Sequence, residues 1–138
     1  MIVDVAARIT EPVTFVRRMT VGGKRADAWE CQTYPMCDWQ EADARTLSSD
    51  GSSGDLPSVV VQVPEDQGDP HAALGDWVVR GTFVPTFAGA ALTTSELLSQ
   101  LPAASGRIMR QRDLTGGLSG LQGPIMRYAS VRVYEAGQ

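Results

Sequence analysis

Short runs of β-branched and aromatic residues, separated by glycine, proline and polar residues, recur along this chain. Val59–Val63 is flanked by a proline at each end, and Trp77–Val79 lies between a Gly75–Asp76 turn and Gly81. Runs of this length and composition are typical of strands, and Gly-Asp is a common turn pair. Two such strands, joined by a polar and acidic connection, predict the centre of a small β-barrel or sandwich.

The same pattern predicts four more strands. Val13–Val21 and Ala26–Cys37 are separated by Gly22–Gly23, a pair typical of a tight hairpin. Arg107–Arg112 and Ile125–Glu135 follow near the end of the chain. In the last segment, Ala129, Val131 and Val133 alternate with Tyr128, Arg132 and Tyr134, which predicts two different faces.

A single short helix is expected over residues 94–101. Thr93 and Glu96 have the spacing of a capping box, in which each side chain bonds the backbone of the other residue. Leu97, Leu98 and Leu101 would form the apolar face, and Pro102 would end the helix. The predicted fold is therefore mainly β, a barrel or sandwich with one short α-helix. A chain of 138 residues is predicted to form one domain, residues 1–138. Trp77 is expected to lie in its core beside Val59, Val61 and Val63.

Three segments have the composition of loops or arms. Residues 1–11 are a possible N-terminal arm, while residues 46–57 and 114–124 are polar or glycine-rich and are predicted to be long flexible loops. We expect them to order only against a partner, because they carry little apolar surface to offset their ordering entropy. Leu118 and Leu121 leave two alternatives open for the last loop: a hairpin connection folded back on the barrel, or an arm that packs on another subunit.

The net charge of −4 is unevenly distributed along the chain. Between Thr46 and Ser105 there are seven acidic residues and one arginine, whereas from Gly106 onward five arginines face two acidic residues. Opposite charge on separate segments suits head-to-tail packing of identical copies. We therefore expect Arg107, Arg110 and Arg112 to meet acidic residues such as Asp50, Asp55, Glu65 or Asp66 across a subunit interface. The overall acidity argues against tight wrapping of duplex DNA.

Residues with reactive side chains are few and scattered. Cys31 and Cys37 are too few for a disulfide framework and are expected to be free thiols, and His71 is the single histidine. The acids beside His71 lack calcium-loop spacing, and the glycines of residues 114–124 lack phosphate-loop spacing. No catalytic residues, metal ligands, cofactor or small-molecule substrate are predicted, so we expect no enzymatic activity. No run is long enough to span a membrane, and the start lacks the pattern of a signal peptide, which predicts synthesis in a cytoplasm.

The order of these segments resembles a known family. The Thr14–Met19 strand (TFVRRM) precedes a Gly-Gly turn, and a strand through Tyr34–Trp39 precedes a variable polar loop. Val61–Pro64 (VQVP) then precedes the Gly75–Gly81 stretch (GDWVVRG), and a short capped helix and two strands around a glycine-containing loop follow. This order is similar to that of the small minor capsid proteins of tailed bacteriophages, placed among the head-closure (stopper) proteins of the head–tail connector. In that family, a Gly-Asp-Trp/Ile-Val turn and strand is the most recurrent piece. Two family pairs, Asp-Asn and His-Trp, are replaced here by residues 112–114 and 126–128.

The resemblance implies a β-barrel subunit of an oligomeric ring of twelve copies, in the neck of the virion and assembled in the host cytoplasm. Such a ring would lie below the portal and adaptor, close the DNA-filled head and join it to the tail. Genomic DNA would pass through its channel without specific binding. The alternative that the residues leave open is a small β-barrel module that binds nucleic acid, for which Tyr128, Arg132 and Tyr134 would supply an aromatic and basic face.

Overall fold

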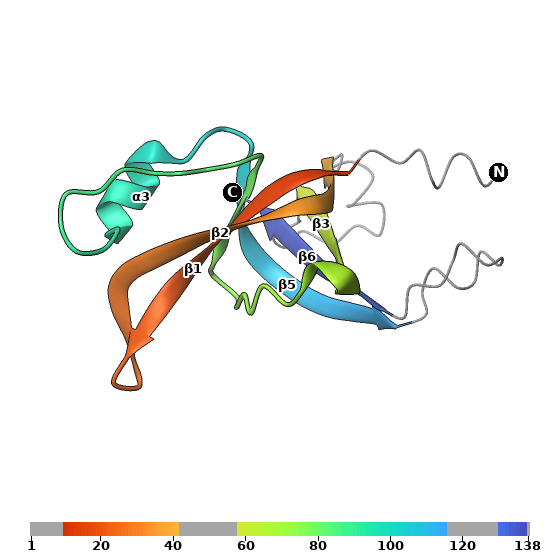
Figure 1. Ribbon diagram of the computed structural model, residues 1–138, viewed down its shortest axis with the longest axis horizontal. Helices are drawn as coiled ribbons and strands as arrows, with labels where there is room; N and C mark the ends of the chain where they lie inside the picture. Colours follow the sequence, from red (N-terminus) through yellow and green to blue (C-terminus); the bar gives the residue numbers. More distant parts are fainter. Residues whose placement is uncertain (1–9, 42–57, 116–129, 138) are drawn as a thin grey trace, which may run out of the picture.

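The computed structural model describes residues 10–41, 58–115 and 130–137, and within these ranges the chain forms a closed six-stranded antiparallel barrel (Figure 1). The strands are β1 (Glu11–Val21), β2 (Lys24–Glu41), β3 (Val59–Pro64), β4 (Trp77–Arg80), β5 (Ser105–Thr115) and β6 (Ser130–Gly137). Their order around the barrel is β1-β2-β3-β6-β5-β4, and β4 closes it by pairing with β1. The prediction of a mainly β fold is confirmed, and the architecture is a barrel.

The β1–β2 hairpin extends beyond the part of β1 that pairs within the barrel. Gly22 and Gly23 both have positive φ angles, of 60° and 79°, which is the conformation that two-residue hairpin turns require. β1 pairs with β4 through Val13–Val16 alone, so the remainder of the hairpin runs on past the barrel, as Figure 1 shows. At its tip, Met19 and Val21 are exposed.

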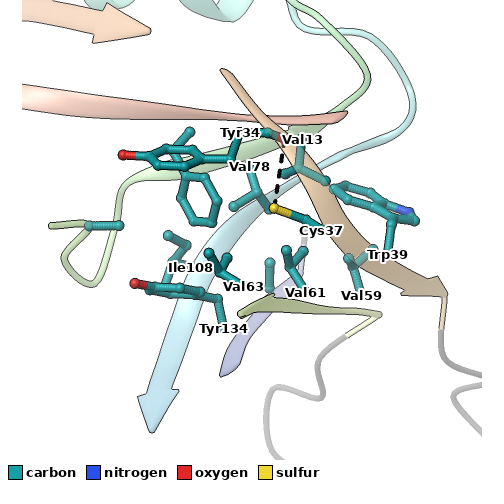
Figure 2. Close-up of a cluster of buried hydrophobic side chains, with 13 residues drawn as sticks. Val13, Tyr34, Cys37, Trp39, Val59, Val61, Val63, Val78, Ile108 and Tyr134 are labelled. Atoms are coloured by element: carbon teal, nitrogen blue, oxygen red, sulfur yellow. Dashed lines mark hydrogen bonds between the residues drawn. The ribbon is translucent and has the colours of Figure 1, made fainter. Parts of the chain in front are cut away.

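The barrel interior is filled by side chains from all six strands and from the loop before β4. Phe15 lies at its centre and makes edge-to-face contacts with Tyr34 and Tyr134, at centroid distances of 5.6 and 4.9 Å. Figure 2 shows the two tyrosine hydroxyls pointing toward one end of the cluster, with Trp39 at the other. The buried cluster comprises Val13, Phe15, Tyr34, Cys37, Trp39, Val59, Val61, Val63, Ala72, Val78, Ile108, Tyr134 and Ala136.

A second, smaller core lies outside the barrel. Here α3 (Thr94–Gln100) and the chain leading to it cover the outward face of β1, β2 and β4. The buried members are Val16, Trp29, Val79, Leu92 and Leu97, with Trp77, Cys31, Phe83 and Leu101 packed against them. The expectation that Trp77 lies in the barrel core is therefore wrong: Trp77 and Val79 point outward from β4, while Val78 between them points inward.

The helix begins as the sequence predicts. The Thr93 hydroxyl accepts from the Glu96 backbone N–H, and the Glu96 carboxylate accepts from the Thr93 N–H, which completes the capping box. Asp27 of β2 accepts from the backbone N–H and the hydroxyl of Thr94, at 2.7 and 2.6 Å. The Trp29 indole N–H donates to that same hydroxyl. These bonds fix α3 to the hairpin.

Segment boundaries differ from the sequence-based expectation at several points. β2 continues to Glu41, past the predicted end at Cys37, because Asp38–Glu41 pairs with β3. Glu11, expected in the N-terminal arm, begins β1, and its carboxylate accepts from Arg80 at 2.6 and 3.1 Å. Leu114, expected in the loop of residues 114–124, belongs to β5 and pairs with Val131. Thr115 also belongs to β5, while residues 116–124, residues 46–57 and residues 1–9 lie outside the described residues.

Replacement of Phe15 by alanine tests the barrel core. Phe15 is 2% exposed and contacts two further aromatic rings, so Phe15→Ala should lower the free energy of unfolding by about 3–5 kcal/mol. Urea denaturation followed by circular dichroism measures this change. Val21→Ala at the exposed hairpin tip is the control, and its effect should stay within about 0.5 kcal/mol. Equal effects of the two substitutions would contradict the assigned core.

The capping box predicts a pH dependence of stability. Backbone hydrogen bonds from Thr93 and Ala88 hold the pKa of Glu96 below its ordinary value of 4.5. A lowered pKa in the folded state contributes stability that is complete above pH 4.5 and is lost as the pH falls through the folded-state pKa. The difference in unfolding free energy between the wild type and Glu96→Gln should therefore shrink on acidification. A difference that grows below pH 4.5 would show that the carboxylate is not stabilised as described.

Candidate functional site

An open groove of about 710 Å³ lies on β5 and β6. Arg110 and Glu135 are partners in the β5–β6 ladder, and Arg112 follows two positions along β5. The described residues that line the groove are Leu74, Met109, Arg110, Gln111, Arg112 and Glu135. It therefore combines two cations, one carboxylate and two apolar side chains on one surface.

The two arginines share one acidic partner. Arg110 Nη1 lies 3.7 Å from Glu135 Oε1, and Arg112 Nη2 lies 3.5 Å from Glu135 Oε2. Both distances exceed that of a charge-assisted hydrogen bond, and the arginine side chains are 62% and 60% exposed whereas Glu135 is 13% exposed. The three groups carry a net charge of one positive unit, held loosely at the surface. Such a cluster can accept a second carboxylate.

A bulge in β5 places Arg110 on this surface. The β5–β6 register shifts between Ile108, which points into the barrel, and Arg110, which pairs with Glu135. In a regular strand, residues two apart share a face, so Arg110 would follow Ile108 inward. The inserted residue, Met109, reverses the alternation and brings Arg110 and Arg112 to the same side as Glu135.

Arg107 lies apart from the groove, although the sequence suggested that it would act with Arg110 and Arg112. Its Nε donates to the Gly75 carbonyl at 3.1 Å, and its guanidinium carbon lies 5.9 Å from the centroid of the Trp77 ring. This geometry is a cation–π contact that covers part of the indole. Arg107 therefore stabilises the turn before β4 and the outward face of Trp77.

The structure describes two of the four acidic residues of the predicted interface, Glu65 and Asp66. Glu65 and Asp66 are exposed and form most of η1, a 3₁₀ turn over Glu65–Gln67 that follows β3 directly. The Gln67 side chain accepts from the Met36 backbone N–H, which ties this turn to β2. Asp50, Asp55, Leu118 and Leu121 lie outside the described residues, so their predicted contacts stay predictions.

A second groove, of about 450 Å³, lies at the base of the projecting hairpin. Three arginines line it, but two are already engaged: Arg17 pairs with Glu30, and the Nε of Arg18 donates to the Ala26 carbonyl. Asp76 is 2% exposed, and its carboxylate accepts from the backbone N–H groups of Arg18 and Ala73. The lining residues are Arg17, Arg18, Met19, Thr20, Arg25, Glu30, His71, Ala73 and Asp76. These bonds hold the hairpin to the loop before β4, which is a structural role.

The described residues with reactive side chains do not converge. His71 is exposed and lies 3.5 Å from Asp69, whose carboxylate also lies 3.5 Å from Arg132. Burial raises the pKa of the Cys31 thiol to about 11 and that of Cys37 to about 12, opposite to the shift of an activated nucleophile. Both cysteines are free. Within the described ranges, no three histidine, cysteine or acidic side chains gather as metal ligands. No helix in those ranges could cross a bilayer.

Two of the three residues suggested for an aromatic and basic nucleic-acid-binding face are described, and they do not form an open face. Tyr134 is fully buried against Phe15, so its ring is not available to stack on a base. Arg132 is paired with Asp69, and Tyr128 lies outside the described residues.

Comparison of the chain with protein-family models, with curated proteins and with solved structures found no match.

Sequence reasoning identified the arginines of the site but missed what surrounds them. Glu135 is nearly the last residue of the chain, and its position between Arg110 and Arg112 depends on the β5–β6 register. The arginine spacing itself carried a signal, because Arg107, Arg110 and Arg112 cannot share one face of a regular strand. Leu74 comes from a loop more than thirty positions earlier, and nothing local in the sequence indicates its contact with the groove.

The separate environments of the arginines can be tested by substitution. Arg107→Ala should cost about 0.5–1 kcal/mol of unfolding free energy, the magnitude of an exposed cation–π contact, and should shift the tryptophan emission because the Trp77 ring is uncovered. Arg112→Ala removes the same charge from the same strand without touching Trp77, so the emission should not change. Identical emission spectra for wild type and Arg107→Ala would contradict the assigned contact.

Proposed function

We propose that this chain is a structural subunit of the neck of a tailed-bacteriophage virion, where a ring of identical copies closes the DNA-filled head and joins the portal and adaptor to the tail. The observation that carries the proposal is the groove on β5 and β6, where two exposed arginines share one carboxylate beside apolar side chains. A mixed apolar and charged surface of this kind suits docking to another protein. The role is mechanical, without catalysis or a cofactor.

Two further features support the proposal. The closed barrel is the fold that the family resemblance implies, and within the barrel closure removes the strand edges that would pair without specificity. The arginine groove and the acidic turn η1 are different surfaces of one chain. Contacts between unlike surfaces are heterologous, and they close into a ring when the rotation between copies permits it. Of the arginines that the sequence suggested, Arg110 and Arg112 remain in the proposed interface with Asp50, Asp55, Glu65 or Asp66, whereas Arg107 is engaged with Gly75 and Trp77.

The net charge fits a channel through which DNA slides. At −4 the subunit repels the phosphate backbone overall, and the described cations of the groove lie beside a carboxylate. A duplex can then pass through the ring without being held. The proposed location is the virion neck, after assembly in the host cytoplasm.

A nonsense mutation in the gene for this chain, in the phage that encodes it, tests the proposal. We expect packaged heads and complete tails that fail to join, with DNA leaking from the heads, and a plasmid copy of the wild-type chain should restore infectious particles. Electron microscopy of lysates and reconstruction of the rescued neck are the measurements. Normal tailed particles without the chain, or its absence from purified virions, would refute the proposal.

A further inference from the structure

We propose that the β5–β6 groove binds the acidic turn η1 of a second copy of this chain, with Asp66 supplying a second carboxylate to Arg110 and Arg112. The inference rests on the proposed ring and names the surfaces that join its subunits. Of the arginines and acidic residues that the sequence predicts at the interface, it selects those of the groove and those of η1. Arg107 is not part of the contact, because its guanidinium is engaged with Trp77 and Gly75.

Among the described residues, the arginines of the groove are incompletely neutralised. Glu135 faces two guanidinium groups at 3.5 and 3.7 Å, and a single carboxylate cannot balance both charges. The arginine side chains are about three-fifths exposed, so they can turn toward an incoming acid without first breaking a tight bond. Leu74, which is 58% exposed, lines the same groove and would lose its water contact when the groove is filled. The site therefore favours an acidic partner with some apolar surface.

The turn η1 has the matching character. Asp66 is exposed, and its carboxylate makes no ion pair among the described residues, while Glu65 beside it adds a second negative charge. Pro64 precedes the turn, the Gly68 N–H bonds the Glu65 carbonyl, and Gln67 is bonded to Met36. Because the backbone is fixed at both ends, presenting Asp66 to a partner requires little further ordering.

The two surfaces differ, so the contact is head-to-tail. η1 follows β3 and contacts β2 and β6, whereas the groove is formed by β5, the end of β6 and the loop before β4. Each copy would offer its groove to one neighbour and its turn to another, which propagates into a ring or an open filament. The charges of the groove can therefore be reversed in one chain and those of the turn in another, and the contact predicts that the two altered chains bind each other.

The experiment uses two charge-reversed versions of the whole chain. The groove variant carries Arg110→Glu and Arg112→Glu, and the turn variant carries Glu65→Arg and Asp66→Arg. Self-association of each purified protein is measured by sedimentation velocity over a range of concentrations, and circular dichroism verifies that each variant remains folded. We expect either variant alone to associate at least about tenfold more weakly than wild type, because every contact then places like charges together.

Mixing the two variants should restore association in alternating order. In the mixture, the acidic groove of one chain faces the basic turn of the other, and the remaining groove and turn keep their original charges. A single chain carrying all four substitutions should also associate with itself. The matched control is Lys24→Glu with Arg25→Glu at the exposed hairpin tip, which reverses the same number of charges and should leave association unchanged.

Several outcomes would overturn the inference. They are a mixture that stays dissociated, a hairpin-tip control as weak as the groove variant, a wild type that remains monomeric at every concentration, or a groove that binds only a different acidic protein. These results are distinguishable from failure of the proposed function. If the chain self-associates with restored mixing but is absent from virions, the contact stands and the neck assignment fails.

Discussion

Closure of the barrel depends on four residues. Trp77–Arg80 pairs with Val13–Val16 of β1 on one side and, through Trp77–Val79, with the start of β5 on the other. Without this short strand, β1 and β5 would present open edges, and the interior around Phe15 would be uncovered along one side. β4 is also covered on both faces, by the barrel core at Val78 and by the outer cluster at Val79. This explains why the strand reads as a continuous apolar run rather than as an alternating one.

The shortness of β4 accounts for much of the remaining architecture. β1 has eleven residues and β4 has four, so the far part of the hairpin has no strand beside it on the β4 side. Directly before β4 begins, Asp76 substitutes for a strand: its carboxylate accepts the Arg18 N–H that a longer β4 would have bonded. Beyond the other end of β4, the Thr14 hydroxyl donates to the Gly81 carbonyl and accepts from the Phe83 N–H, which directs the chain over the outer face toward α3. The second core therefore results from where β4 stops.

Patterns of residues adjacent in the sequence were sufficient to predict the strands and the helix. The arrangement of the groove depends instead on the pairing register of strands that are far apart in the sequence. The Gly22–Gly23 turn, the Thr93–Glu96 capping box and the strands around Val61 and Val78 were predicted because each depends on residues adjacent in sequence. The burial of Trp77 was misassigned because β4 is apolar on both faces, so alternation could not indicate which face pointed inward. The pairing of Arg110 with Glu135 was beyond sequence reasoning for a different reason, since it depends on a bulge and on a strand contributed by the end of the chain.

The bulge at Met109 in β5 determines both what packs in the barrel core and which charges lie on the surface. If β5 continued past Ile108 without the bulge, the Arg110 guanidinium would point into an interior lined by Tyr134 and Ala136, where an unpaired charge is strongly destabilising. The bulge avoids that cost and at the same time places Arg110 and Arg112 on either side of Glu135. Because Glu135 alternates along β6 with the buried Tyr134 and Ala136, its position is fixed by core packing. The strands therefore hold the three charged residues in register as long as the barrel is folded, and a partner that binds there has to order only the exposed arginine side chains.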